Sequence, residues 1–234
     1  MAPLIVGAGP AGCAAAIMLA RAGASPLIRE QTSVTGDALC GGFLSWRTRQ
    51  SLDALGIDAA ALGGHKVTRV VLYSGHRSAS APLPAPGIGL SRRHLDTVML
   101  ARAMDDGARI ERGIRLLAVE SDGTARFDHG EAIDPDSLFF ANGKHDVRGL
   151  PRREARSGGD LSIGIRLRLG PHPALTEMIG DRIELHLFDR GYGGLILQED
   201  GTANLCMAVR KSALATFGGQ PLALLDHLAS RDDP

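Results

Sequence analysis

The chain has 234 residues and carries 26 Lys and Arg against 26 Asp and Glu, so its formal net charge at pH 7 is zero. This balance gives no electrostatic reason to expect binding to nucleic acid or to an anionic membrane surface. The three cysteines, Cys13, Cys40 and Cys206, are widely separated and odd in number, which favours a reducing, cytoplasmic location over a disulfide framework. No C-x-x-C or H-E-x-x-H spacing occurs, so no metal site is predicted.

The N-terminal segment predicts a strand, a glycine-rich turn and a helix. "PLIV" is a short apolar run typical of a buried parallel strand, "GAGPAG" contains G-x-G-x-x-G, and "CAAAIMLARAG" continues as a helix that ends at Gly23. No Lys or Arg precedes Arg21, which disfavours a signal peptide, and the glycines interrupt the apolar run, which disfavours a transmembrane segment.

This turn has the residues that a dinucleotide site requires. Gly7 allows the tight reversal, Gly9 lets the backbone approach a pyrophosphate, and Gly12 allows the helix to pack closely on the strand. The phosphates are expected at the helix N-terminus. The next run, "SPLIRE", ends in Glu30, close to where an acid is expected to bind the ribose hydroxyls. The alternative is a glycine-rich turn with only a structural role.

The middle of the chain predicts mixed structure. A polar loop at 31–42 leads into a helix at 43–56, and the two runs at 65–83 predict a hairpin around "SGH". "PAPGIG" at 84–89 is expected to be a linker before a helix at 90–107. Strand-like runs at 109–130 precede a buried run, "SLFFANG".

The C-terminal part has the alternation of an antiparallel sheet with one covered face. The alternating runs are "LSIGIRLRL", "RIELHLF", "GYGGLIL" and "TANLCMAV". A helical stretch, "PLALLDHLASRDDP", follows them. The whole sequence therefore predicts an α/β protein with a second, antiparallel region.

With these motifs, and with "CGGFLSWRT", "FFANGKHDVRG" and "GYGGLILQEDGTANLC", the chain resembles a group of FAD-dependent oxidoreductases. The group comprises para-hydroxybenzoate hydroxylase-type monooxygenases, geranylgeranyl reductases and flavin-dependent halogenases, and the reductase-like branch is the most similar. The resemblance implies a Rossmann-like FAD-binding domain of the glutathione-reductase type, formed by residues 1–65 and 88–160. It also implies an antiparallel β substrate domain formed by residues 66–87 and 161–234.

The resemblance also implies a set of FAD contacts. They comprise the pyrophosphate turn, the acid at the adenosine ribose with its neighbour, and a loop that runs past the flavin. They also include an arginine at a helix start, beside the flavin phosphates or the ribityl chain, and the turn after a core strand. In this sequence they are Gly7, Gly9, Pro10, Ala11, Gly12, Glu30, Gln31, Cys40, Gly41, Gly42, Arg92, Ala141, Asn142 and Gly143.

Alternatives stay open at several of these positions. Instead of contacting FAD, Arg92 could belong to a solvated helix start that Ser91 caps. Cys40 could be a small buried cysteine in a turn. Asp146 and Arg148 fit either a loop beside the flavin or a surface ion pair.

The predicted chemistry is carried by FAD, with NAD(P)H as the external reductant, so no catalytic acid–base pair is identified. Cys40 is a candidate on the loop beside the flavin. The C-terminal strands offer mostly Leu, Ile and Phe with Tyr192 and Met207, which favours a small apolar substrate, isoprenoid or aromatic. The alternative is that these side chains fill the core. Halogenases of the group carry W-x-W-x-I-P where this chain reads "GYGGLIL", and the only tryptophan is Trp46, which disfavours halogenation. Monooxygenation and double-bond reduction both stay open, and the sequence does not predict an oligomeric state.

Relatives in the group continue to a C-terminal Gly-Asp motif that contacts the flavin pyrophosphate, whereas this chain ends at Pro234. The resemblance therefore implies a C-terminally truncated substrate domain that holds FAD less tightly. The alternative function is a catalytically impaired module that binds FAD or another nucleotide. A third alternative, an NAD enzyme, fits the antiparallel region less well.

Overall fold

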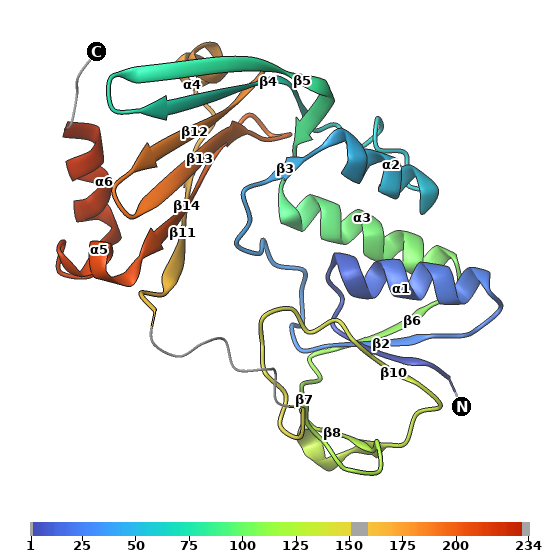
Figure 1. Ribbon diagram of the computed structural model, residues 1–234. Helices are drawn as coiled ribbons and strands as arrows, with labels where there is room; N and C mark the ends of the chain where they lie inside the picture. The colour runs from blue at the N-terminus through green and yellow to red at the C-terminus, as the bar shows by residue number, and fades with distance from the viewer. Residues whose placement is uncertain (1, 151–158, 231–234) are drawn as a thin grey trace. The chain divides into compact units, whose positions relative to one another are not determined.

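The computed structural model describes residues 2–150 and 159–230 (Figure 1). The chain divides into two compact units, the first formed by parts of 1–37, 51–58 and 93–157 and the second by parts of 38–50, 59–92 and 158–234. Each unit has its own sheet and its own buried apolar side chains.

A four-stranded parallel sheet forms the centre of the first unit, with strand order β10-β1-β2-β6. Its strands are β1 (Leu4–Val6), β2 (Leu27–Glu30), β6 (Arg109–Arg112) and β10 (Leu138–Phe140). Helix α1 (Pro10–Arg21) packs against β1 and β2, which it connects. Ile5 and Ile28 are completely buried, as expected for strands covered on both faces. The helix α3 (Arg92–Asp105) precedes β6.

A small antiparallel sheet packs against this parallel sheet. It contains β7 (Leu116–Val119), β8 (Ala125–Phe127) and β9 (Ala132–Ile133), with a short 3-10 helix, η1 (Asp128–Gly130), between β8 and β9. Ala125 and Phe127 form one apolar cluster with Leu4 of β1. The buried Arg29 of β2 lies over the Phe127 ring, 4.4 Å from its centre.

A seven-stranded sheet forms the second unit, with strand order β11-β14-β13-β12-β4-β5-β3. All neighbouring strands are antiparallel except β4 and β12. The strands are β3 (Phe43–Leu44), β4 (His65–Ser74), β5 (Arg77–Gly89), β11 (Ser162–Leu169), β12 (Arg182–Phe188), β13 (Gly191–Leu197) and β14 (Ala203–Arg210).

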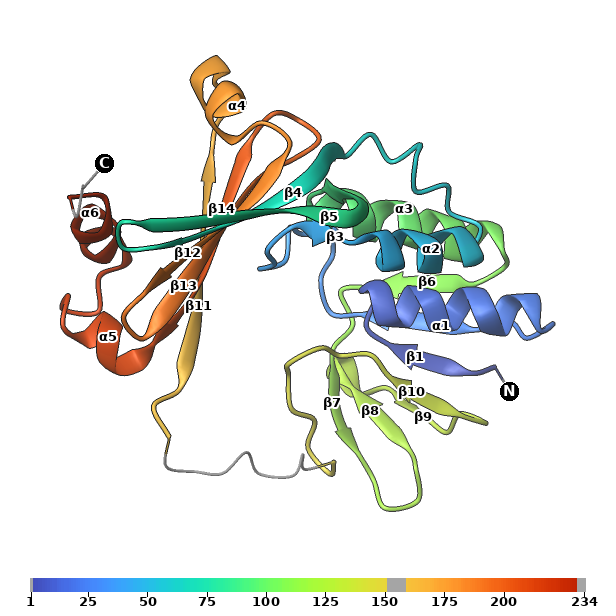
Figure 2. The ribbon, with the colours of Figure 1, turned by 45° about the horizontal axis from the view of Figure 1, so that its top comes forward.

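Helices cover one face of this sheet (Figure 2). Met207 and Val209 pack with residues of α5 (Lys211–Ala215) and α6 (Pro221–Ser230). Leu197 packs with Ile179 of α4 (Pro173–Ile179) on the same face. The remaining helix, α2 (Trp46–Ala54), follows β3.

The predicted fold class is confirmed, but one predicted linker is wrong. Residues 84–89 belong to β5, which ends at Gly89. The pairing of β4 and β5 shifts between Val67 and Arg69, where the residues after Pro82 form a bulge. Pro84 and Pro86 lie in this bulge, where no ladder hydrogen bond requires their missing N–H groups.

The compact units also differ from the predicted domain ranges. Residues 38–50, 59–65, 88–92 and 159–160 group with the second unit, in which β3 pairs with β5 and β4 begins at His65. Residues 151–158 and 231–234 of the predicted domains lie outside the described residues. The assignment of FAD to one domain and substrate to the other stays a prediction.

Candidate functional site

The glycine-rich turn after β1 has no room for larger side chains at two positions. Gly7 has a φ of +105°, and a Cβ there would lie 2.4 Å from the carbonyl oxygen of Ala141. A Cβ on Gly12 would lie 1.9 Å from the carbonyl oxygen of Gly7. The turn therefore packs tightly between the start of α1 and the residues that follow β10. This packing brings together Gly7 and Ala141, two of the predicted FAD contacts.

The N-terminus of α1 has no anionic partner of its own. Its N-cap is Gly9 with extended backbone, its first residue is Pro10, and its first turn, which includes Ala11, contains no acidic residue. No side chain among the described residues caps this end. The partial positive charge of the helix N-terminus and its unused N–H groups therefore suit a phosphate.

The carboxylate of Glu30 lies at the same turn. Its Oε2 accepts a hydrogen bond of 2.8 Å from Ala8 N, and its Oε1 accepts bonds from the backbone N and the hydroxyl of Thr32. Burial alone would raise the pKa of Glu30, but these hydrogen bonds and the charge of Arg112 outweigh burial and lower it. Glu30 is therefore ionised at neutral pH and suited to accept from ribose hydroxyls. Gln31 is exposed beside it.

These three features fit the ADP half of FAD. The turn has no space for a Cβ on Gly7 or Gly12, and the N-terminus of α1 has no side-chain cap among the described residues. An ionised carboxylate, that of Glu30, lies at the end of β2. Each is what a dinucleotide requires at this point of a βαβ unit.

Cys13 lies behind the turn and has a packing role. Its side chain is completely buried, and its Sγ donates to Ala8 O at 3.3 Å. Burial, aided by the charge of Asp96, raises the pKa of the Cys13 thiol to about 12. A thiol with this pKa is not a nucleophile at neutral pH.

The turn after β10 holds the other candidates of the first unit. Ala141 N donates to Val6 O at 2.9 Å, and the side chain of Asn142 donates to His145 O at 2.5 Å. Gly143 has a φ of +63°. Arg148 is exposed, and its carbonyl accepts from Val119 N at 2.9 Å.

In the second unit, the loop with Cys40, Gly41 and Gly42 is held by a side chain from β14. Asn204 Nδ2 donates to Cys40 O at 3.1 Å and to Gly41 O at 3.0 Å. Cys40 is half-buried, and its Sγ accepts from Gly42 N at 3.5 Å. A Cβ on Gly41 would meet nothing within 4 Å, so the backbone is accessible at this point of the loop.

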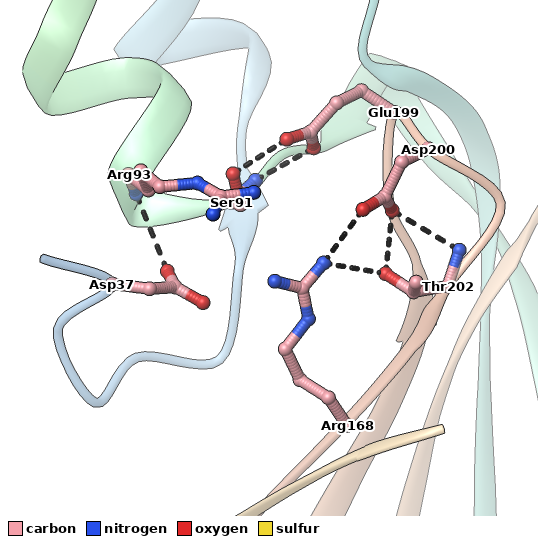
Figure 3. Close-up of polar contacts among 7 residues, drawn as sticks. All are labelled: Asp37, Ser91, Arg93, Arg168, Glu199, Asp200 and Thr202. Carbon is pink, nitrogen blue, oxygen red and sulfur yellow. Dashed lines mark hydrogen bonds and ion pairs between the residues drawn. The ribbon is translucent and has the colours of Figure 1, made fainter. Parts of the chain in front are cut away.

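Arg92 is the first residue of α3, directly after the buried Ser91. Ser91 N and Oγ both donate to the carboxylate of Glu199, at 2.8 and 2.5 Å (Figure 3). In the same unit, Arg168 donates to Asp200 and Thr202.

Glu199, Asn204 and the neighbouring Gln198 were not predicted from the sequence. Ser91 and Glu199 are 108 positions apart, and Cys40 and Asn204 are 164 apart. No local pattern marks such a pair, although all three residues lie in the stretch "GYGGLILQEDGTANLC" that carries the family resemblance.

The described residues contain neither a metal-binding cluster nor a membrane-spanning helix. Across 2–150 and 159–230, no group of three His, Cys, Asp or Glu side chains could hold a metal ion. Over the same ranges, no helix is both long enough and apolar enough to cross a membrane.

Comparison with known proteins identifies the family. Residues 1–129 match the family described as "FAD binding domain", which is more than half of the chain. The chain belongs to this FAD-binding family. It is 34% identical over 218 residues to a menaquinone reductase of Mycobacterium tuberculosis, covering 86% of this chain and 53% of that protein. It is 26% identical over 236 residues to digeranylgeranylglycerophospholipid reductase 2 of Methanopyrus kandleri, covering 89% of this chain and 54% of that protein.

The fold of this FAD-binding chain also occurs among solved structures. A flavoprotein/dehydrogenase of Cytophaga hutchinsonii superposes with a TM-score of 0.79 at 19% identity, covering 99% of this chain and 61% of that chain. The family resemblance seen in the sequence is thereby confirmed. The chain spans about half the length of the curated relatives it matches.

Proposed function

We propose that this member of the FAD-binding oxidoreductase family binds the ADP half of FAD at its glycine-rich turn and acts on an apolar organic substrate. The observation that carries the proposal is the Glu30 carboxylate, 2.8 Å from Ala8 N at a turn that accepts no side chain at Gly7 or Gly12. The N-terminus of α1 would hold the pyrophosphate, and Glu30 would accept from the ribose hydroxyls.

Bound FAD would supply the electron transfer, and the chain's own residues would orient it. In the second unit, the loop of Cys40, Gly41 and Gly42 and the side chain of Arg92 are the proposed contacts with the flavin part. Gly41 supports this role because its backbone is accessible. NAD(P)H is the proposed reductant. The three cysteines are free, which supports the proposed cytoplasmic location.

The proposal of an apolar substrate is supported by the exposed side chains on one face of the seven-stranded sheet. Leu185 pairs with Leu72, and Leu187 pairs with Tyr192, so these four side chains share the face opposite to α4, α5 and α6. Leu72, Leu187 and Tyr192 are 38%, 43% and 47% exposed. Large apolar side chains left this exposed on one face support binding of an apolar molecule.

Met207 does not belong to this surface. It is 3% exposed and packs with α5 on the covered face, and Phe188 packs there too. The alternation of apolar and polar residues along β14 is compatible with either face being covered.

Double-bond reduction is the favoured reaction, because both named relatives are reductases. Monooxygenation is the second candidate, and a module that binds FAD without turnover is the third. Menaquinone and digeranylgeranylglycerophospholipid, the molecules in the relatives' names, are therefore the first substrates to test.

The test is a titration of the purified chain with FAD, followed by anaerobic addition of NADH or NADPH and then of each lipid. We expect FAD to bind, its absorbance to bleach with one nicotinamide, and the colour to return on addition of a lipid without oxygen. Colour that returns only with oxygen and yields a hydroxylated product supports monooxygenation. Bound flavin that neither step affects supports the binding module, and failure to bind FAD contradicts the proposal.

A further inference from the structure

One hairpin turn of the second unit contacts two segments that are far away in the sequence. The turn lies between β13 and β14, at residues 198–202, and Asn204 follows it. It contacts Ser91, next to the candidate Arg92, and the loop of Cys40, Gly41 and Gly42. Both segments carry proposed flavin contacts.

The first contact is a carboxylate that accepts two hydrogen bonds from one residue. Glu199 Oε2 accepts from Ser91 N at 2.8 Å, and Glu199 Oε1 accepts from Ser91 Oγ at 2.5 Å (Figure 3). Ser91 is 1% exposed, so water competes little with these charge-assisted bonds. Because Arg92 is the next residue, Glu199 restrains the backbone from which the Arg92 side chain extends.

The second contact uses a buried carboxamide. Asn204 is 1% exposed, and its Nδ2 bonds two successive carbonyls, Cys40 O and Gly41 O. Its Oδ1 is buried without a hydrogen-bond partner in 2–150 and 159–230, which is costly for a buried polar atom. Rotating the amide would place Oδ1 against the two carbonyl oxygens, so the loop determines its orientation.

A second buried carboxamide, Gln198, lies next to Gly42 of the loop. It is 3% exposed, and its Oε1 is also buried without a partner among the described residues. A Cβ on Gly42 would lie 2.7 Å from Gln198 Nε2 and 3.4 Å from Asn204 Nδ2. The side-chain nitrogens of Asn204 and Gln198 therefore both lie next to this loop, and those of Asn204 donate to it.

The turn itself is well ordered by its own hydrogen bonds. Asp200 Oδ1 accepts from the backbone N and the hydroxyl of Thr202, and Asp200 Oδ2 accepts from Arg168 at 2.8 Å. Thr202 O accepts from Gln198 N at 2.9 Å. A turn braced in this way can hold both segments in a defined position.

We propose that this turn positions both flavin contacts of the second unit, with Glu199 as the positioning residue for Arg92 and Asn204 as the positioning residue for the Cys40–Gly42 loop. The inference rests on the proposed binding of FAD. Neither residue contacts the flavin in this assignment. Each acts through the backbone it holds, so its loss should weaken the binding of FAD and leave the binding of ADP, which only the glycine-rich turn holds, unchanged.

The experiment compares FAD and ADP binding to the full chain and to the variants Glu199→Gln and Asn204→Leu. Glu199→Gln removes the charge and one acceptor, and Asn204→Leu removes both donors at similar volume. We expect each variant to raise the dissociation constant of FAD roughly tenfold without changing that of ADP. We also expect the absorbance bands of bound flavin to shift.

Two control variants match the changes. Asp189→Asn removes one negative charge from the turn between β12 and β13, where Asp189 pairs only with Arg190 among the contacts of the described residues. Val209→Ala shortens a completely buried side chain in the same strand as Asn204. Both should leave the ratio of FAD to ADP affinity at its wild-type value, even where Val209→Ala lowers the melting temperature.

The outcomes separate the inference from the proposed function. A wild-type chain that does not bind FAD contradicts the proposed function, and the inference falls with it. A wild-type chain that binds FAD, together with variants of unchanged FAD affinity and spectrum, overturns the inference alone. A parallel loss of FAD and ADP affinity also overturns it, because that result indicates general destabilisation. Adding Ser91→Ala to Glu199→Gln should cause little further loss, since the two changes break the same contact.

Discussion

At the residue scale, the chemistry of the candidate site depends most on Glu30. Its carboxylate accepts three hydrogen bonds from Ala8 and Thr32, and these donors together with Arg112 hold its pKa below the usual value although burial acts in the opposite direction. The side chain is therefore preorganised as an anion at the end of β2. An anion here binds hydroxyl groups and repels a phosphate, so FAD or NAD fits and a 2′-phosphate does not.

We expect Glu30→Gln to raise the dissociation constant of FAD about 10- to 100-fold, because a hydrogen bond to a charged group contributes about 1.5–3 kcal/mol. Fluorescence quenching of FAD measures this change, and Gln31→Ala, at the exposed neighbour, is the control.

The pH dependence of the wild type should agree with this assignment. Because the pKa of Glu30 is lowered from 4.5, the carboxylate stays ionised, and FAD affinity stays constant, as the pH falls toward that value. Affinity should then decrease as the pH drops through the lowered pKa, since protonation removes the acceptor. Glu30→Gln should lack this step. An unchanged FAD affinity in Glu30→Gln at pH 7 would rule out the ribose contact.

At the element scale, the site depends on the close approach of α1 to β1. This approach is possible because Gly12 has no side chain: a Cβ at this position would lie 1.9 Å from Gly7 O, which is a backbone atom that cannot rotate away. The helix, the turn and the strand must therefore move together when the volume at residue 12 changes.

Gly12→Ala should lower the free energy of unfolding by about 1–3 kcal/mol, the usual cost of overpacking, and weaken ADP binding because α1 shifts. Urea unfolding and an ADP titration measure the two effects. Gly36→Ala is the matched control, since a Cβ on Gly36 would have no atom within 4 Å, and it should change stability by less than about 0.5 kcal/mol. Equal stability of the two variants would contradict the packing at Gly12.

At the scale of the whole molecule, the two units have separate cores and separate proposed roles. Leu4 and Phe127 belong to the apolar cluster of the first unit, and Met207 and Leu224 to a cluster of the second. All proposed contacts with the ADP half lie in the first unit, and the loop at Cys40 lies in the second.

Hydrogen–deuterium exchange should therefore distinguish ADP from FAD. We expect ADP to slow exchange in α1 and at the end of β2, because bound phosphates and ribose protect these amides, and to leave residues 38–44 unchanged. FAD should protect the same amides and, in addition, residues 38–44. Slower exchange at 38–44 with ADP alone would contradict the division of FAD contacts between the units.

Sequence reasoning predicted the βαβ unit correctly, because the relevant signals are local. Gly7, Gly12 and Glu30 lie within 24 residues, and each position is marked by its residue type. The error at 84–89 has the opposite cause. The two alternating prolines and two glycines of this segment are typical of a linker, and only the pairing with β4 and the bulge beside Arg69 make it part of a strand.

The sequence by itself determined the family, the glycine-rich turn and the acid at the end of β2, because short-range geometry demands particular residue types at those positions. Only the tertiary structure decided which face of the seven-stranded sheet is covered, since the alternation of β14 is compatible with either face. It also decided the partners of Glu199 and Asn204, which lie 108 and 164 positions away from them. A hydrogen bond across such a separation depends on how strands pair, and no property of the neighbouring residues encodes that pairing.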